Sequence, residues 1–129
     1  MKNKIFKIIG TISFIGVFTI LIITLYNNIT LNNKNKELEN YLKEVNFEMS
    51  LFDVPLHYHF YDASHNENYD FSHIFDQTLV SMYPSNAVTF VDNHDTEPSQ
   101  SLASFIPDWF KGHAYCLTLL RKAGYPCVF

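Results

Sequence analysis

The middle of the chain lacks positive charge. Between Leu51 and Gln100 there are eight Asp or Glu residues and no Lys or Arg. A surface built from this stretch would repel phosphate backbones, so the sequence predicts that the protein binds no nucleic acid. Cysteine is scarce as well. Cys116 and Cys127 form no CxxC motif and no zinc-type cluster, and their apolar neighbours predict small buried side chains.

The composition nevertheless suits a folded protein. Of the 129 residues, 47% are hydrophobic and 16% are aromatic, which is enough for a packed core and excludes a disordered chain. The length allows at most one modest domain. The first quarter of the chain does not look globular, so roughly 95 residues remain for a fold.

A long apolar run lies near the N-terminus. Residues 8–26 carry no charge and follow Lys2, Lys4 and Lys7. At about 1.5 Å per residue a helix of this length spans about 28 Å, close to the hydrocarbon thickness of a bilayer. With the positive flank 1–7 in the cytoplasm, we predict a transmembrane signal anchor and a single-pass membrane protein whose C-terminal part lies outside the cytoplasm. Secretion after signal cleavage is the alternative, although no small-x-small cleavage site follows the run.

Beyond a polar linker predicted at 27–36, the pattern alternates between helices and strands. Apolar residues spaced by three and four predict helices, and short apolar runs predict strands. This α/β order favours a parallel sheet with right-handed crossovers. The expected elements are a helix at 37–47, a strand at 50–56, a polar aromatic loop at 57–69, a helix capped by Asp70, a strand at 87–91, a helix at 107–122 and a strand from Tyr125 onward.

Polar side chains follow the expected strand at 87–91 directly. The run AVTFV has no alternation, as expected of a strand covered on both faces, and Asn93, His94 and Asp95 come after it. In parallel α/β folds, functional groups gather beyond the carboxyl ends of the strands, because the loops converge there. These three residues are therefore either a functional site or a loop of polar capping groups.

The stretch FVDNHDTEPSQSLASFIPDWFKGHAYCLTLLRKAGYPCVF resembles the seventh and eighth barrel segments of α-amylases in glycoside hydrolase family 13, in particular the bacterial liquefying and cytoplasmic type. Upstream, LENYL and LFDVPLHY are similar to the family's fifth helix and sixth strand. The resemblance covers residues 37–129. It implies an α/β fold that is part of a (β/α)8 TIM barrel, about strands six to eight with their helices, here preceded by the predicted transmembrane helix.

The resemblance also implies a function. Family members are endo-hydrolases that cleave α-1,4-glucosidic bonds of starch or glycogen with retention. By resemblance, His94 donates hydrogen bonds to sugar hydroxyls, and Asp95 is a catalytic carboxylate that stabilises the transition state. The nucleophile and the acid/base belong to barrel strands four and five, which this sequence does not contain. We therefore expect a truncated catalytic segment that is inactive alone, and we expect no cofactor, since the family's calcium sites lie in the missing regions.

Several positions depart from the family pattern. Glu97 replaces a Gln, Ser99 replaces a Gly, and Gly112 with His113 replaces the common Pro-Leu. Two alternatives to an inactive segment stay open. The chain could be half of a split α-amylase that a second chain completes, with α-glucan as substrate. It could instead be a membrane-anchored module that binds glucan or a partner through the loop 58–69.

A second cluster of candidates is the pair His57 and His59. On a strand, residues i and i+2 share a face, so the two imidazoles together with His94 and Asp95 could bind a metal ion. The family has an amide at the position of His59 and no histidine ligand at either position, so we predict no metal site. The aromatic residues Trp109, Phe110 and Tyr115 are expected in the core face of the helix at 107–122.

Overall fold

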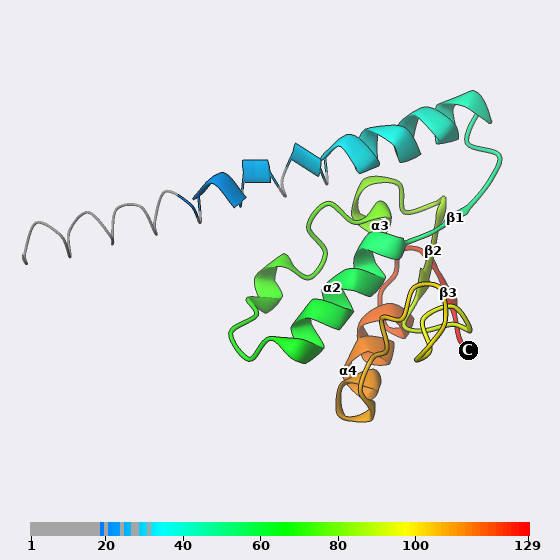
Figure 1. Cartoon of the computed structure of the whole chain (residues 1–129). Coiled ribbons are helices and arrows are strands. Elements are labelled where there is room, and N and C mark those ends of the chain that lie inside the picture. The colour runs from blue at the N-terminus through cyan, green and yellow to red at the C-terminus, as the bar shows by residue number, and fades with distance from the viewer. Residues whose placement is uncertain (1–18, 20, 24, 27–28, 31) are drawn as a thin grey trace, which may run out of the picture. The chain divides into compact units, whose positions relative to one another are not determined.

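The computed structural model divides the chain into two compact units, Met1–Leu38 and Glu39–Phe129. The described residues of the first unit are helical (Figure 1), and in the second unit residues 39–44 are helical. The expected helix at 37–47 is thus confirmed over most of its length. The structure describes residues 19, 21–23, 25–26, 29–30 and 32–129.

The predicted transmembrane anchor at 8–26 finds no support. Residues 8–18, 20 and 24 of this run lie outside the described residues. Within the part of the chain that the structure describes, no helix is both long and apolar enough to cross a bilayer. This finding contradicts the predicted single-pass membrane localisation, and the membrane as a partner is not supported.

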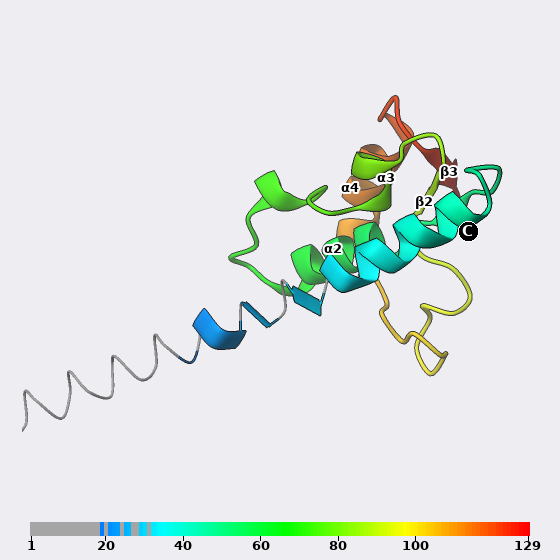
Figure 2. The ribbon, with the colours of Figure 1, turned by 90° about the horizontal axis from the view of Figure 1, so that it is seen from above.

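A parallel three-stranded sheet organises the second unit, in the order β1 (Leu51–Phe52), β2 (Ala87–Phe90) and β3 (Tyr125–Cys127). Leu51 lies opposite Ala87, and Phe90 lies opposite Cys127. In two perpendicular views, helices α2, α3 and α4 gather on the same side of the strands (Figures 1 and 2). The predicted α/β class with a parallel sheet is confirmed, although three strands do not make a closed barrel.

Helix α2 (Val54–His65) occupies the segment that the sequence predicted as a strand end and a polar loop. Asp53 caps this helix by accepting a hydrogen bond of 3.2 Å from the Leu56 backbone amide. Pro55 lies in the first turn, where its missing N–H costs no hydrogen bond. The predicted strand at 50–56 and the loop at 57–69 are therefore largely wrong. The buried side chains of α2 follow a helical stripe, namely Leu56, His57, Phe60, Ala63 and Ser64.

The helix predicted after Asp70 is broken into two short pieces. Asp70 caps the 3-10 helix η1 (Phe71–His73), and Thr78 caps α3 (Leu79–Met82). Gln77, between them, has a φ of 53°, a left-handed conformation that no helix continues through. The cap prediction for Asp70 is confirmed, and the single long helix is wrong.

Helix α4 (Asp108–Leu119) confirms the helix predicted at 107–122, although it ends three residues earlier. Phe110 is buried as predicted. Trp109 is 64% exposed, so its predicted place in the core is wrong. Cys116 and Cys127 are also exposed rather than buried. The main core of the second unit consists of Leu42, Leu56, Phe60, Ala63, Ile74, Leu79, Val80, Ala87, Val91, Ile106, Phe110 and Ala114.

Candidate site at the carboxyl end of strand β2

A closed turn carries the two residues that the sequence singled out. The side-chain oxygen of Asn93 accepts hydrogen bonds from the backbone amides of Asp95 (2.9 Å) and Thr96 (3.2 Å). The Thr96 hydroxyl donates to the Asn93 carbonyl and accepts from the Asn93 amide, both at 2.9 Å. Thr96 is fully buried. The chain therefore leaves β2 in one defined conformation.

His94 and Asp95 lie together on the solvent side of this turn. Their side chains are 79% and 46% exposed, and 3.6 Å separates His94 Nε2 from Asp95 Oδ2. Ser101 Oγ donates to Asp95 Oδ1 at 3.3 Å, and the Leu102 amide donates to the Asp95 carbonyl at 2.9 Å. The backbone of Asp95 is thus held while its carboxylate can still accept hydrogen bonds from a ligand. The structure brings the two predicted site residues side by side.

Asp92, just before the turn, is a buried carboxylate held by helix α4. Lys111 Nζ lies 2.7 Å from Asp92 Oδ2, and the Tyr115 hydroxyl donates to Asp92 Oδ1 at 2.8 Å. The hydrogen bond to Asp92 is the main cause that raises the pKa of Lys111. Burial, followed by the hydrogen bond to Asp92, raises the pKa of Tyr115 to about 12. Both donors therefore keep their protons at neutral pH.

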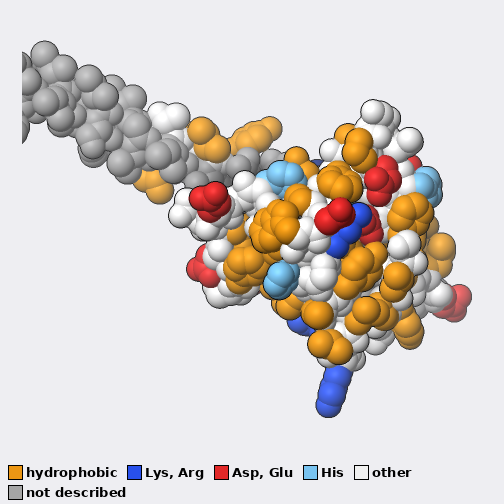
Figure 3. All heavy atoms as spheres, turned by 90° about the horizontal axis from the view of Figure 1, so that it is seen from below, with side chains coloured by type: hydrophobic (Ala, Val, Ile, Leu, Met, Phe, Trp, Pro, Cys, Tyr) orange, Lys and Arg blue, Asp and Glu red, His pale blue; other side chains and the backbone are white. Residues whose placement is uncertain are grey.

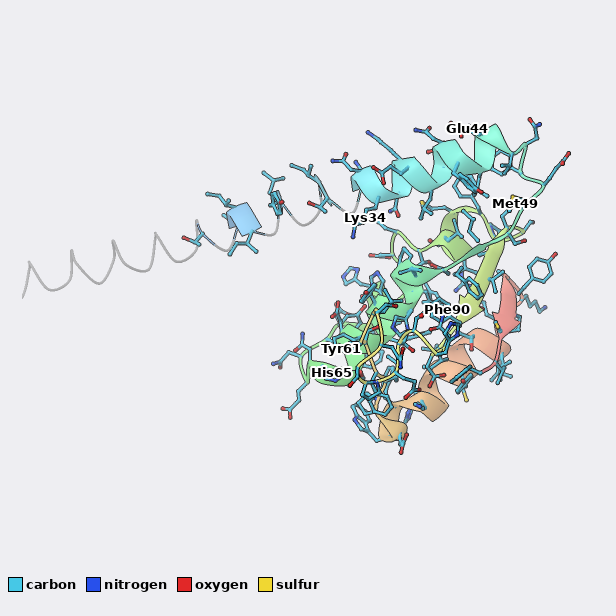
Figure 4. The ribbon with its side chains drawn as sticks, turned by 45° about the vertical axis from the view of Figure 1, so that its right-hand side comes forward. Lys34, Glu44, Met49, Tyr61, His65 and Phe90 are labelled. Carbon is cyan, nitrogen blue, oxygen red and sulfur yellow. The ribbon has the colours of Figure 1, made fainter. Side chains whose placement is uncertain are left out.

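His57 links three segments beneath the site. Its Nδ1 lies 2.6 Å from the Val91 carbonyl and its Nε2 lies 2.7 Å from Ser104 Oγ. A carbonyl only accepts, so Nδ1 carries the proton, and Nε2 accepts from the Ser104 hydroxyl. The imidazole also stacks on Phe90, with ring centroids 5.1 Å apart. Phe90 is the last residue of β2 (Figure 4). Burial lowers the pKa of His57, which agrees with this neutral tautomer.

The metal alternative for His57 and His59 rested on a strand that does not exist. Both residues lie on helix α2, and both nitrogens of His57 already have protein partners. His59 Nδ1 lies 2.7 Å from the Tyr69 hydroxyl. Over the described residues, no group of three or more His, Cys, Asp or Glu side chains is placed to bind a metal ion.

Sequence reasoning missed the residues that support the turn. Asp92 was part of the quoted motif, but its partners on α4 lie about twenty residues further along the chain. One signal was present: Lys111 and Tyr115 are spaced i, i+4, which places two hydrogen-bond donors on one face of the helix. His57 pairs with Val91 and Ser104, and no comparable local signal in the sequence marks either partner.

Comparisons with known proteins agree with the resemblance noted in the sequence. No family model matches the chain. It is 56% identical over 93 residues to glucan 1,4-alpha-maltohexaosidase of Bacillus sp. (strain 707) and 55% identical over 93 residues to alpha-amylase of Bacillus licheniformis. It is also 46% identical over 94 residues to the cytoplasmic alpha-amylase of Escherichia coli (strain K12), whose name gives no support to a membrane protein.

The matches cover most of this chain and little of its relatives. They include 71% of the chain for the two Bacillus proteins and 72% for the Escherichia coli protein. The same matches cover only 18%, 18% and 19% of those relatives. The chain therefore spans less than a fifth of the length of these curated relatives.

Proposed function

We propose that the second unit of this chain, which is similar to α-amylases over the matched residues, binds α-glucan as part of an endo-hydrolase of α-1,4-glucosidic bonds. The observation that supports this proposal is the pair His94 and Asp95. Both lie on a hydrogen-bonded turn beyond β2, and both are open to a ligand. A carboxylate and an imidazole in this arrangement suit a ligand rich in hydroxyl groups, since one accepts and the other donates hydrogen bonds.

In the proposed complex, Asp95 accepts hydrogen bonds from neighbouring hydroxyls of one glucose ring. Its negative charge favours the oxocarbenium-like transition state of glycoside cleavage, which is an electrostatic role. His94 donates to a hydroxyl of the same ring. A retaining hydrolase also needs a nucleophile and an acid/base. By resemblance, no residue of this chain takes those two roles, so we propose that the chain by itself binds glucan without cleaving it.

Calorimetric titration of the full chain with maltohexaose tests this proposal. We expect a dissociation constant on the order of 1 mM, as suits a partial site with few contacts. Asp95→Asn should weaken binding about tenfold, because it removes the charge that accepts the sugar hydroxyls. The matched control is Asp76→Asn, which neutralises a carboxylate that is 59% exposed. Equal affinity of Asp95→Asn and the parent chain, or equal binding of cellohexaose, would contradict the proposal.

A second candidate function is completion of an active α-amylase by a polypeptide that carries the further strands. Large apolar side chains of the sheet are exposed, and this observation favours the second candidate, because the faces of parallel sheets are normally covered. Phe52 and Tyr125 are 51% and 60% exposed. In addition, hydrophobic side chains occupy much of the surface that is seen from below in Figure 3. Co-expression with a polypeptide containing the nucleophile and acid/base strands should then yield starch hydrolysis. No activity above that of either polypeptide alone would exclude it.

A further inference from the structure

We infer that Lys111 and Tyr115 of helix α4 are positioning residues for the His94–Asp95 pair, and that they act through the buried carboxylate of Asp92. The functional part of this inference rests on the proposed glucan-binding role of that pair. Lys111 and Tyr115 make their hydrogen bonds to Asp92, three residues before Asp95. They would therefore set the place of the binding groups without contacting the ligand.

The first step is the charge of Asp92. Its side chain is only 5% exposed, and a buried carboxylate requires a counter-charge or several hydrogen-bond donors. The acidic stretch between Leu51 and Gln100 contains no Lys or Arg. The counter-charge must therefore come from another element, and Lys111 of α4 supplies it. Its Nζ also lies over the Phe105 ring, 4.8 Å from the ring centroid.

The second step is the geometry of the contact. Lys111 and Tyr115 lie one helical turn apart, and each takes a different oxygen of Asp92. A single hydrogen bond would leave the carboxylate free to rotate. Two donors on two oxygens fix both its position and its orientation, and so they fix the backbone of Asp92 as well.

The third step is transmission to the site. Asn93 follows Asp92 directly, and its side chain closes the turn by accepting from the amides of Asp95 and Thr96. Thr96 is fully buried, which anchors the far side of this turn. The turn is therefore a short, hydrogen-bonded unit. A displacement of Asp92 at its first residue would carry Asp95 with it.

The opposing explanation is that the pair only stabilises the fold. Four variants of the full chain separate the two roles. Lys111→Met removes the cation, and Lys111→Arg keeps it. The double variant Asp92→Asn with Lys111→Met removes both charges, so no unpaired buried charge remains. Ala114→Gly is the control for stability, since it weakens the same helix at a buried position that makes no hydrogen bond to Asp92.

Two measurements are made on each variant: maltohexaose affinity by calorimetry, and the amide shifts of residues 94–96 in the two-dimensional nitrogen-proton NMR spectrum. Lys111→Met should move these amide signals and weaken maltohexaose binding about tenfold, because small displacements of binding groups have large effects. Lys111→Arg should restore affinity to within about threefold. Ala114→Gly should lower the melting temperature while it leaves the affinity and the three amide signals unchanged.

The double variant gives the decisive result. We expect its melting temperature to recover relative to Lys111→Met, whereas its affinity stays weak, because the two-point contact is lost. Recovery of affinity together with melting temperature would overturn the inference, as would an equal loss of affinity in Ala114→Gly. If the parent chain does not bind maltohexaose, the proposed function fails. The amide shifts alone then test whether Lys111 positions the turn. Unchanged signals for residues 94–96 in Lys111→Met would then overturn the inference.

Discussion

Asp53 and Asp92 are both buried carboxylates that follow neighbouring parallel strands, yet they are held in different ways. Asp53 accepts hydrogen bonds from three backbone amides, those of Leu56, Leu79 and Val80, at 3.2, 3.0 and 2.7 Å. Asp92 is held by two side chains of one helix. The three backbone donors of Asp53 do not offset its burial, which raises the pKa of this carboxyl.

This difference indicates that Asp53 determines the fold, whereas Asp92 supports the candidate site. The donors of Asp53 are amides in the first turns of α2 and α3, so one carboxylate caps α2, accepts from α3 as well, and ties both helices to the end of β1. The donors of Asp92 are side chains, and its neighbours along the chain are the turn with His94 and Asp95. Loss of Asp53 should therefore affect the whole unit, whereas loss of Asp92 should chiefly affect the turn.

The largest effect is expected for Asp53→Ala. This change leaves three buried amides without an acceptor and removes the side-chain cap of α2. We expect the free energy of unfolding to fall by about 3 kcal/mol or more, as measured by urea denaturation of the full chain. Asp53→Asn keeps one acceptor oxygen and should have an intermediate effect. A loss below about 1 kcal/mol for Asp53→Ala would remove the distinction between the two carboxylates.

Asp92→Ala should cost less stability, about 1–2 kcal/mol, because its partners can find other environments. Lys111 is already 26% exposed, so its ammonium can turn toward water along its flexible stem. Urea denaturation gives the stability, and the amide signals of residues 94–96 report the turn. The comparison predicts that these signals move more in Asp92→Ala than in Asp53→Asn. The reverse order would contradict it.

A pH dependence of the stability should come from His57, whose ring nitrogens bind the Val91 carbonyl and Ser104 Oγ. Burial lowers its pKa in the folded state, so the unfolded chain takes up the proton first as the pH falls below about 6.5. Stability from the neutral imidazole is complete above that pH and decreases below it, by at most about 1.4 kcal/mol per pH unit. Urea denaturation at pH 7.5 and 5.5 should show a smaller decrease for His57→Gln than for the parent chain. Equal decreases would show that His57 is not the source.

The smallest effect on stability is expected at the exposed end of the site. The His94 side chain is 79% exposed, and its Nε2 lies 3.6 Å from Asp95 Oδ2. We expect His94→Ala to change the free energy of unfolding by less than about 0.5 kcal/mol. Maltohexaose binding should weaken in the same variant. A large loss of stability would place His94 in the fold rather than in the binding site.

Local sequence patterns predicted the parts of the fold in which local propensity and packing agree. The uninterrupted run at 87–91 formed β2, and Pro107 with Asp108 marked the start of α4. Parallel strand order then placed His94 and Asp95 beyond a strand end, as the structure has them. The exposed position of Trp109 was missed because helical periodicity alone does not say which neighbours cover each face.

Other features depend on contacts between distant segments. The segment after Asp53 looked polar, and its helix is capped by a carboxylate that also binds amides about 26 residues away in sequence. The Lys111 contact to Asp92 likewise requires α4 to pack beside β2. Neither pairing could be read from spacing.

The central claim is that the turn after β2 presents Asp95 to an α-glucan. The most direct test is an NMR titration of the full chain with maltohexaose, followed through its amide signals. We predict saturable shifts confined to residues 93–102, and their loss in Asp95→Asn. No shift at several times the expected dissociation constant, or shifts centred instead on the surface hollow lined by Phe71, Trp109 and His113, would contradict the claim.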